Sequence, residues 1–223
     1  MLVTGCRSGI GLAIAVKSAQ QGMIVYAGLR DIQTKDNLML QSQGLNILPV
    51  QLDITIPEQR EQVVEQILQE QGHLDILVNN AGVGLGGFLE ELSEEEMRFV
   101  FEVNFFGLWA LSKLCIPLLR DSKGALVMIS SLSGRMALPA LGSYCASKFA
   151  LEGLTETWRH ELKPFDIDVI SIQPGAYKTD MTGPNRRMSP HEGTAHPFYK
   201  IMGANMEEWY DRNAVAKAYP PSH

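Results

Sequence analysis

A phenol and an ammonium group stand four residues apart in the chain, at Tyr144 and Lys148. Residues four apart lie on one face of an α-helix, so Lys148 is expected to hold its charge beside the Tyr144 hydroxyl. A free tyrosine has a pKa of about 10, and a neighbouring cation favours the phenolate and lowers that pKa. The pair therefore predicts a general acid and base, although an isolated tyrosine and lysine at this spacing also occur by chance on a helix surface.

Three other short segments accompany this pair. Ser130 and Ser131 end an apolar run before Tyr144, the segment 4–11 reads TGCRSGIG, and the segment 79–82 reads NNAG. In this order and at these separations the four segments resemble the short-chain dehydrogenase/reductase family, in its compact single-domain branch, over nearly the whole chain. The stretch that begins at Tyr144, YCASKFALEG, is most similar to the hydroxysteroid and retinol dehydrogenase members.

The resemblance implies reversible hydride transfer between a nicotinamide cofactor and a secondary alcohol or ketone. It implies that Tyr144 transfers the proton and that Lys148 lowers the tyrosine pKa and binds the nicotinamide ribose. Ser130 and Ser131 compete for a third role, and the family's separation of thirteen residues from the tyrosine selects Ser131, which would hydrogen-bond the substrate oxygen. Asn104 matches the family asparagine that holds a water in the proton relay; a hydrogen-bonded residue at a helix kink is the structural alternative.

Three glycines near the N-terminus predict a turn that binds the cofactor. Gly5, Gly9 and Gly11 are typical of a strand-to-helix turn that lets a pyrophosphate approach the amides at the helix start. Their G-x-x-x-G-x-G spacing is that of short-chain dehydrogenases. Asp53 ends an expected strand, where the family binds the adenine amino group, and an ordinary turn residue is the alternative. The cofactor-binding residues implied are Gly5, Arg7, Ser8, Gly9, Ile10, Gly11, Arg30, Asp53, Asn80, Ala81, Gly82, Tyr144, Lys148, Pro174, Gly175 and Thr179.

The choice between the two nicotinamide cofactors depends on the end of the second expected strand. An NAD enzyme needs an acid there to hold the ribose hydroxyls, whereas a 2′-phosphate needs a cation. This position is Leu29, and Arg30 follows it, with Arg7 able to approach the same ribose. The sequence thus favours NADP(H) over NAD(H). Asp31 leaves NAD possible, and a solvated turn at Arg30 and Asp31 is the alternative.

Apolar runs typical of buried strands alternate with helical patterns along the chain. The strands are expected at 2–3, 23–27, 47–52, 74–78, 124–130 and 167–172, and the long helices at about 94–119 and 141–162. Capping boxes that begin at Thr55 and Ser93 mark two helix starts. This alternation predicts an α/β fold, a doubly wound parallel sheet with helices on both faces, Rossmann-like and three-layered, in a single domain spanning residues 1–223.

The C-terminal third carries further expectations. The helix 141–162 is expected to pack through Phe149, Leu154 and Trp158. The segment 183–206 loses periodicity and resembles the family's substrate lid. Residues 213–218 look like the start of a further helix, and the family's seventh strand has no counterpart, which weakens one expected sheet edge.

Composition narrows the class of function. The chain has 223 residues, 45% hydrophobic and 20% charged, which suits one globular domain. A net charge of −6 argues against nucleic acid as a partner. Three cysteines without C-x-x-C spacing and scattered histidines predict neither disulfides nor a metal site. Without a recognisable signal peptide or a run of about 20 apolar residues, a cytoplasmic protein lacking a transmembrane segment is expected.

The partner expected is a small hydrophobic alcohol or ketone, like a steroid, retinoid or lipid. This expectation rests on apolar residues near the lid and the approach loop: Leu132, Met136, Leu138, Met188, Phe198, Met202 and Trp209. A 3-oxoacyl thioester reductase is the alternative enzyme, and a non-catalytic dinucleotide sensor is the alternative from another class. By resemblance, association as a homodimer is expected through the helices 94–119 and 141–162.

Overall fold

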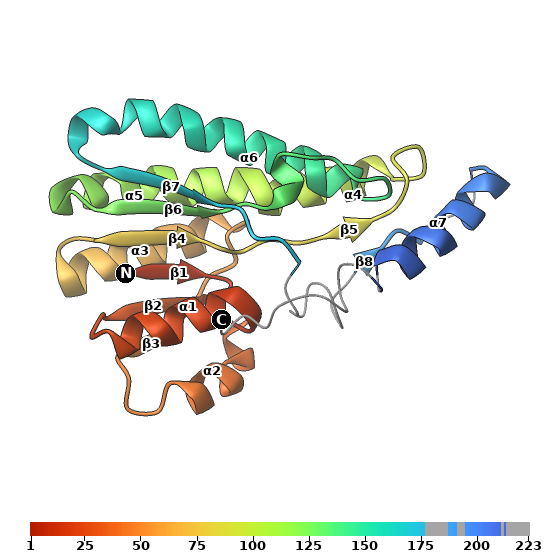
Figure 1. Ribbon diagram of the computed structural model, residues 1–223. Helices are drawn as coiled ribbons and strands as arrows, with labels where there is room; N and C mark the ends of the chain where they lie inside the picture. The colour runs from red at the N-terminus through yellow and green to blue at the C-terminus, as the bar shows by residue number, and fades with distance from the viewer. Residues whose placement is uncertain (177–186, 191–194, 211, 213–223) are drawn as a thin grey trace.

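Six strands pair in parallel in the order β3-β2-β1-β4-β6-β7 in the computed structural model (Figure 1). The structure describes residues 1–176, 187–190, 195–210 and 212. From β1 the chain winds outward to β3 and then returns to wind through β4, β6 and β7, so the doubly wound sheet predicted from the sequence is confirmed. The strands are β1 Leu2–Thr4, β2 Val25–Leu29, β3 Ile47–Gln51, β4 Ile76–Asn79, β6 Ala125–Ile129 and β7 Asp168–Ile172.

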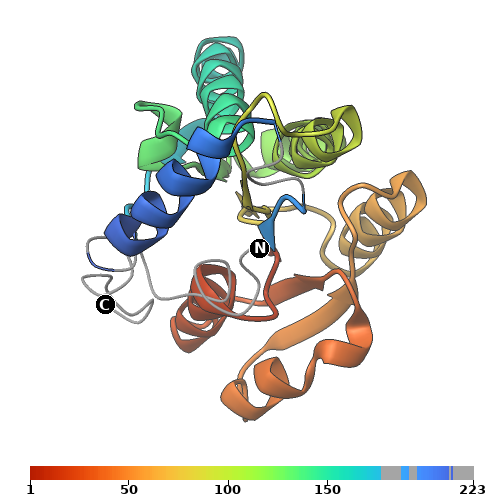
Figure 2. The same ribbon diagram turned by 90° about the vertical axis from the view of Figure 1, so that its right-hand side faces the viewer.

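Helices cover both faces of this sheet, as Figure 2 shows from the side on which the strands end. One hydrophobic cluster joins the sheet to α3, α5 and α6, and a second joins the opposite face to α1 and α2. Leu2 and Val3, neighbours in β1, belong to different clusters, because successive side chains of a strand point to opposite faces. The helices are α1 Gly9–Gln20, α2 Asp36–Gln41, α3 Pro57–Gln71, α4 Glu94–Phe101, α5 Leu108–Ser122, α6 Gly142–Glu161 and α7 Pro197–Tyr210.

The second strand begins two residues later than predicted. Met23 and Ile24 precede it and are 38% and 40% exposed. Pairing with the neighbouring strands instead continues through Gly28 and Leu29, which lie opposite Val50 and Gln51 of β3. A Cβ at Gly28 would lie 3.0 Å from the Leu52 side chain, so a residue type that usually marks a turn is here favoured by close packing within the strand.

One of the two predicted capping boxes is present. Ser93 accepts a hydrogen bond from the Glu96 amide, and the Glu96 carboxylate accepts one from the Ser93 amide, at the start of α4. The box at Thr55 is wrong, because α3 begins at Pro57 with Ile56 as its N-cap. The Thr55 hydroxyl donates instead to the Asp53 carboxylate at 2.7 Å.

The predicted helix 94–119 consists of three parts: α4, a π-helical turn η2 (Glu102–Gly107) and α5. Together they form a helical stretch, Glu94–Ser122, whose length and composition would allow it to cross a membrane. One such helix is weak evidence of a transmembrane segment. Here Leu108, Leu111 and Leu119 are fully buried in the cluster between α5 and the sheet. Packing in the core therefore accounts for part of this apolarity, since 39% of the most apolar window is buried.

Helix α6 confirms two of its three predicted packing residues. Trp158 is buried in the core and Leu154 packs against it. Phe149 is 46% exposed, so its predicted packing role is wrong.

The C-terminal segment contains more regular structure than the loop predicted at 183–206. Strand β8 (Arg187–Met188) pairs in parallel with β5 (Leu85–Gly86), and α7 follows as a helix beyond the carboxyl ends of the main strands (Figure 1). The predicted helix start at 213–218 lies outside the described residues. Among the strands that the structure describes, β7 forms one outer edge of the six-stranded sheet and β3 the other.

Candidate active site

The loop between β1 and α1 is fastened to the end of β4. Asn80 donates from Nδ2 to the carbonyl oxygens of Thr4 at 2.8 Å and Gly5 at 3.2 Å. The Thr4 hydroxyl accepts in turn from the amides of Asn80 and Ala81. A Cβ at Gly11 would lie 2.4 Å from both Asn80 Nδ2 and the Gly5 oxygen, so this close approach requires glycine. The contact joins two strands at the point where the strand order reverses, where doubly wound sheets bind ligands.

The N-terminus of α1 suits the pyrophosphate of a dinucleotide. Ser8 is the N-cap residue but makes no side-chain capping bond, and the first turn contains no acidic residue. Gly5 and Gly9 adopt φ values of +71° and +62°, which glycine reaches without strain. The amides at the start of the helix, including that of Ile10, therefore meet the requirements of an anion site.

Leu29 is the last residue of β2 and Arg30 follows it, and their side chains lie in opposite environments. The Leu29 side chain is fully buried, whereas Arg30 is exposed. Asp31 accepts a hydrogen bond from the Gln33 amide at 3.0 Å and caps the short helix η1 (Ile32–Thr34). The carboxylate that complicates the cofactor prediction thus has a local structural partner.

Asp53 makes the contacts of a turn residue. Its Oδ1 accepts from both the amide and the hydroxyl of Thr55, at 2.9 and 2.7 Å. These are the hydrogen bonds that the structural alternative implied. A contact with adenine stays a prediction.

Tyr144 and Lys148 share a face of α6, and the Lys148 nitrogen lies 5.8 Å from the centre of the Tyr144 ring. Lys148 is only 3% exposed, and its Nζ donates to the Ile129 oxygen at 2.9 Å. Burial lowers the pKa of Lys148 from 10.5 to about 8, and the nearby Glu152 carboxylate opposes this change. A Cβ at Gly82 would lie 3.8 Å from that nitrogen, so the segment after β4 also reaches the site.

Asn104 lies fully buried in the π-helical turn η2 and binds two other segments. Its Oδ1 accepts from the Val83 amide at 2.8 Å, and its Nδ2 donates to the Val83 oxygen at 2.9 Å and the Ser147 hydroxyl at 3.0 Å. Ser147 donates to the carbonyl oxygen of Tyr144. Asn104 is thus a hydrogen-bonded residue at a helix irregularity, as the structural alternative held, and it also lies beside the turn that carries Tyr144 and Lys148.

The two candidate serines differ in environment. Ser130 is buried at 4% exposure, and its hydroxyl has no partner of standard hydrogen-bond geometry, although it faces the Glu152 carboxylate. Ser131 is partly exposed and caps the short helix η3 (Leu132–Gly134), where its oxygen accepts from the Ser133 amide at 3.1 Å. Only the second of these hydroxyls lies on the accessible side of the strand end.

The remaining predicted cofactor residues follow β7. Pro174 accepts a hydrogen bond from the Leu132 amide at 3.0 Å, which ties this segment to the Ser131 loop. A Cβ at Gly175 would lie 3.4 Å from the Leu132 side chain. Thr179 lies outside the described residues.

Three polar residues of this region were missed by the sequence reasoning: Thr4, Ser147 and Glu152. Each lies buried and makes hydrogen bonds that hold the segments together. The available signal was a polar residue at the end of a buried strand for Thr4, and polar residues on the inward face of α6 for the other two, which would be costly to bury without partners.

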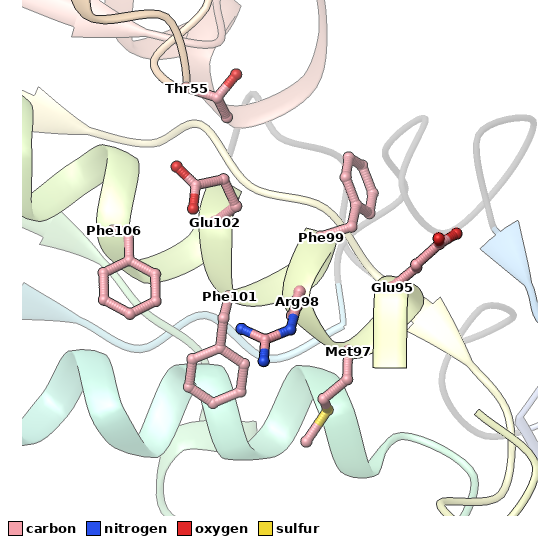
Figure 3. Close-up of a pocket in the computed structure, with 8 residues that line it drawn as sticks. All are labelled: Thr55, Glu95, Met97, Arg98, Phe99, Phe101, Glu102 and Phe106. Atoms are coloured by element: carbon pink, nitrogen blue, oxygen red, sulfur yellow. The ribbon is translucent and has the colours of Figure 1, made fainter. Parts of the chain in front are cut away.

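A hollow of about 620 Å³ lies elsewhere, on α4 and η2 (Figure 3). Its lining includes Met97, Phe101 and Phe106 from the helices and Thr55 from the loop before α3. None of the residues predicted for catalysis lines it, so the chemistry of this protein is better sought at the strand ends.

Comparison with known proteins agrees with this arrangement. The family model described as short chain dehydrogenase matches residues 1–190. A 3-ketodihydrosphingosine reductase from Bacteroides thetaiotaomicron is 39% identical over 194 residues, which make up 86% of this chain and 69% of the relative. The chain belongs to the short-chain dehydrogenase/reductase family. Its similarity to human retinol dehydrogenase 8 is 39% identity over 82% of this chain and 60% of the relative.

Solved structures place this short-chain dehydrogenase in the same fold. A short-chain dehydrogenase from Streptomyces avermitilis superimposes with a TM-score of 0.85 at 33% identity, covering 99% of this chain and 78% of that one. An alcohol dehydrogenase from Thermococcus sibiricus, complexed with 5-hydroxy-NADP, gives a TM-score of 0.77 at 31% identity, covering 86% and 82%. The family acts on alcohol and carbonyl groups with a nicotinamide dinucleotide, and this chain is an enzyme of that class.

The buried ammonium of this dehydrogenase predicts a specific pH dependence of stability. Because the pKa of Lys148 is near 8 when folded and near 10.5 when unfolded, the unfolded chain holds more protons between these values. The free energy of unfolding should therefore rise with pH across this range, by up to about 3 kcal/mol from this residue.

The measurement is urea unfolding of the wild type and Lys148→Met at several pH values from 7 to 11. Subtracting the variant removes the contribution of other groups that titrate in this range. The wild type should gain stability relative to the variant as pH rises above about 8. A difference that does not change with pH would contradict the lowered pKa.

Proposed function

We propose that this enzyme transfers a hydride between NADP(H) and a secondary alcohol or ketone of a hydrophobic substrate. The observation that carries the proposal is the phenol of Tyr144 beside a buried ammonium, Lys148, at the carboxyl edge of the sheet. The alternative of a non-catalytic dinucleotide sensor would not need a buried charge at this cost.

The residues of the site have complementary tasks in this proposal. The cofactor supplies the hydride when it is bound. Tyr144 donates a proton to the substrate oxygen during reduction, and Lys148 stabilises the phenolate that forms. Ser131 donates a hydrogen bond to the same oxygen as charge develops on it. Asn104 positions the turn of α6 through Ser147 and holds the relay water.

Exposed apolar side chains near the site support a hydrophobic substrate. Leu132 and Met136 follow Ser131 and are exposed, and α7 carries the exposed Phe198 and the half-buried Met202. The Tyr199 hydroxyl of α7 donates to Glu90 at 2.7 Å, which ties this helix to the loop after β5. The names of the relatives, a ketodihydrosphingosine reductase and a retinol dehydrogenase, favour the same class. A 3-oxoacyl reductase, also among the relatives at 35% identity, is the alternative that a substrate panel would distinguish.

NADP(H) is favoured by the residues at the end of β2. A buried Leu29 offers no acid to the ribose hydroxyls, and the exposed Arg30 offers a guanidinium to a 2′-phosphate. The Asp31 carboxylate accepts from the Gln33 amide, which supports a structural role for it.

The first prediction from this proposal concerns the proton donor. Tyr144→Phe should keep the fold and cofactor binding and lower kcat by about 10²–10⁴-fold, because only the transferable proton is lost. Turnover is to be measured on a panel of steroids, retinoids and oxoacyl thioesters, with cofactor binding followed by fluorescence. Unchanged turnover would remove Tyr144 from the mechanism.

Two neighbouring serines provide a matched control. Ser131→Ala should lose most of its turnover, whereas Ser130→Ala removes the same atom from a buried position and should lose much less. Equal losses would mean that the substrate oxygen is not bound by Ser131 alone.

A second prediction concerns the cofactor. The double variant Leu29→Asp/Arg30→Ala should reverse the preference by adding an acid and removing the cation, changing the ratio of kcat/KM for NADP(H) and NAD(H) about tenfold to hundredfold. Both cofactors are to be compared in both proteins. A wild type that prefers NAD(H) would show that Asp31 faces the ribose instead.

A third prediction concerns association. Large apolar side chains are exposed on the helices expected to form a homodimer: Phe106 at 48%, Trp109 at 41% and Phe149 at 46%. Burying such residues favours a dimer. Light scattering of the wild type and of Trp109→Glu/Phe149→Glu should give a dimer and a monomer. A stable wild-type tetramer or a wild-type monomer would exclude the proposed dimer.

A further inference from the structure

Glu152 lies one helical turn after Lys148 on α6 and is buried, with 8% of its surface exposed. A carboxylate is costly to bury, so its hydrogen-bond partners indicate what it does. The proposed mechanism assigns it no step. Its partners come from two other segments that reach the strand ends.

Two of these partners belong to β7 and the segment after it. Ser171 donates from its hydroxyl to Glu152 Oε1 at 2.7 Å, and Gln173 donates from Nε2 to Oε2 at 2.8 Å. Gln173 directly precedes Pro174 and Gly175, which are predicted to bind the cofactor. The carboxylate therefore fixes the start of this segment to α6.

The Ser131 loop is the other segment. Arg135, the residue after η3, lies with Nη2 at 3.3 Å from Glu152 Oε2. Gly134, the residue before Arg135, is buried against α6. A Cβ at this glycine would lie 3.0 Å from Glu152 Cγ, the Lys148 oxygen and the Ser130 hydroxyl oxygen. A side chain at residue 134 would therefore force the loop or its neighbours on α6 to shift.

We propose that Glu152 is a positioning residue that fastens the Ser131 loop and the Gln173–Gly175 segment to the turn of α6 that carries Lys148, and that its negative charge keeps the Lys148 ammonium protonated. The inference deepens the proposed function and rests on it for the role of the ammonium. It requires that Glu152 itself is ionised.

The charges around Glu152 support this state. Burial works to raise the pKa of Glu152, but the hydroxyls of Ser130 and Ser171, the Gln173 amide and the Arg135 guanidinium outweigh burial and lower it. The charged groups that face it are Lys148 on its own helix and Arg135 on the loop; the groups from β7 are neutral. Glu152 is therefore the negative charge that acts on Lys148, and Arg135 is paired with Glu152.

The test is the pKa of Lys148, measured by NMR of its labelled side chain and assigned by its absence in Lys148→Met. Glu152→Gln should lower this pKa by about one unit, because an opposite charge is removed at similar volume. Glu156→Gln is the matched control: it removes the same charge from the same helix at an exposed position and should leave the pKa unchanged. No substrate is needed, so failure of the proposed function does not affect the result.

Arg135→Gln provides an independent second variant, because the Arg135 side chain is 61% exposed and its loss spares the fold. Removing this cation leaves the Glu152 charge uncompensated and should raise the Lys148 pKa, opposite in sign to Glu152→Gln. If Glu152→Gln does not fold, Arg135→Gln decides. An unchanged pKa in either folded variant, or an equal shift in Glu156→Gln, would overturn the electrostatic part of the proposal.

Binding of NADPH and NADH, followed by quenching of tryptophan fluorescence, tests the positioning part. Glu152→Gln should weaken binding of the preferred cofactor about tenfold through the Gln173–Gly175 segment, while Glu156→Gln should not. Equal affinities in all three proteins would show that Glu152 does not position this segment.

Discussion

Lys148 carries a positive charge into the interior of the protein, and the arrangement around it follows from that burial. An isolated ammonium in such a place would lose its proton or would destabilise the packing of the helix that carries it. The Ile129 oxygen and the Glu152 carboxylate compensate the charge, which requires α6 to lie against the end of β6. Gly134 packs against the same turn of α6, where a Cβ would lie 3.0 Å from the Lys148 oxygen. The position of α6 thus depends on the partners of the Lys148 charge as well as on its apolar face.

A second contact, between β1 and β4, organises the cofactor side without any charge. Asn80 donates to Thr4 from its backbone amide and from its side chain across two parallel strands, and Gly11 allows the helix start to approach them. Backbone groups at strand ends have lost their ladder partners, and side-chain amides and hydroxyls satisfy them here. The side chains of Thr4 and Asn80 therefore bind other parts of the protein at this edge of the sheet. The backbone amides at the start of α1 are the groups that suit a bound anion.

Local signals in the sequence were sufficient where a segment determines its own structure. The Ser93 box was predictable because its partners lie within one turn. The strands were predictable as apolar runs, yet the start of β2 was not, because pairing with β3 and not hydrophobicity decides that Met23 and Ile24 stay outside. Thr55 fits a capping pattern, but its hydroxyl donates a hydrogen bond to the Asp53 carboxylate instead. Helix α7 escaped prediction because its contacts with the loop after β5 are distant in sequence.

The π-helical turn at Asn104 makes the length of the chain there as important as its side chains. Such a turn contains one residue more than an α-helical turn, so the side chains that follow are rotated by about 100° relative to an uninterrupted α-helix. Val100 before it and Leu108 after it both face the core with this extra residue in place. Deleting a single residue from 102–107 would turn one of these faces outward, whereas many substitutions would leave both in phase. In evolution or in engineering, this stretch is therefore a place where insertions and deletions are excluded more strictly than replacements.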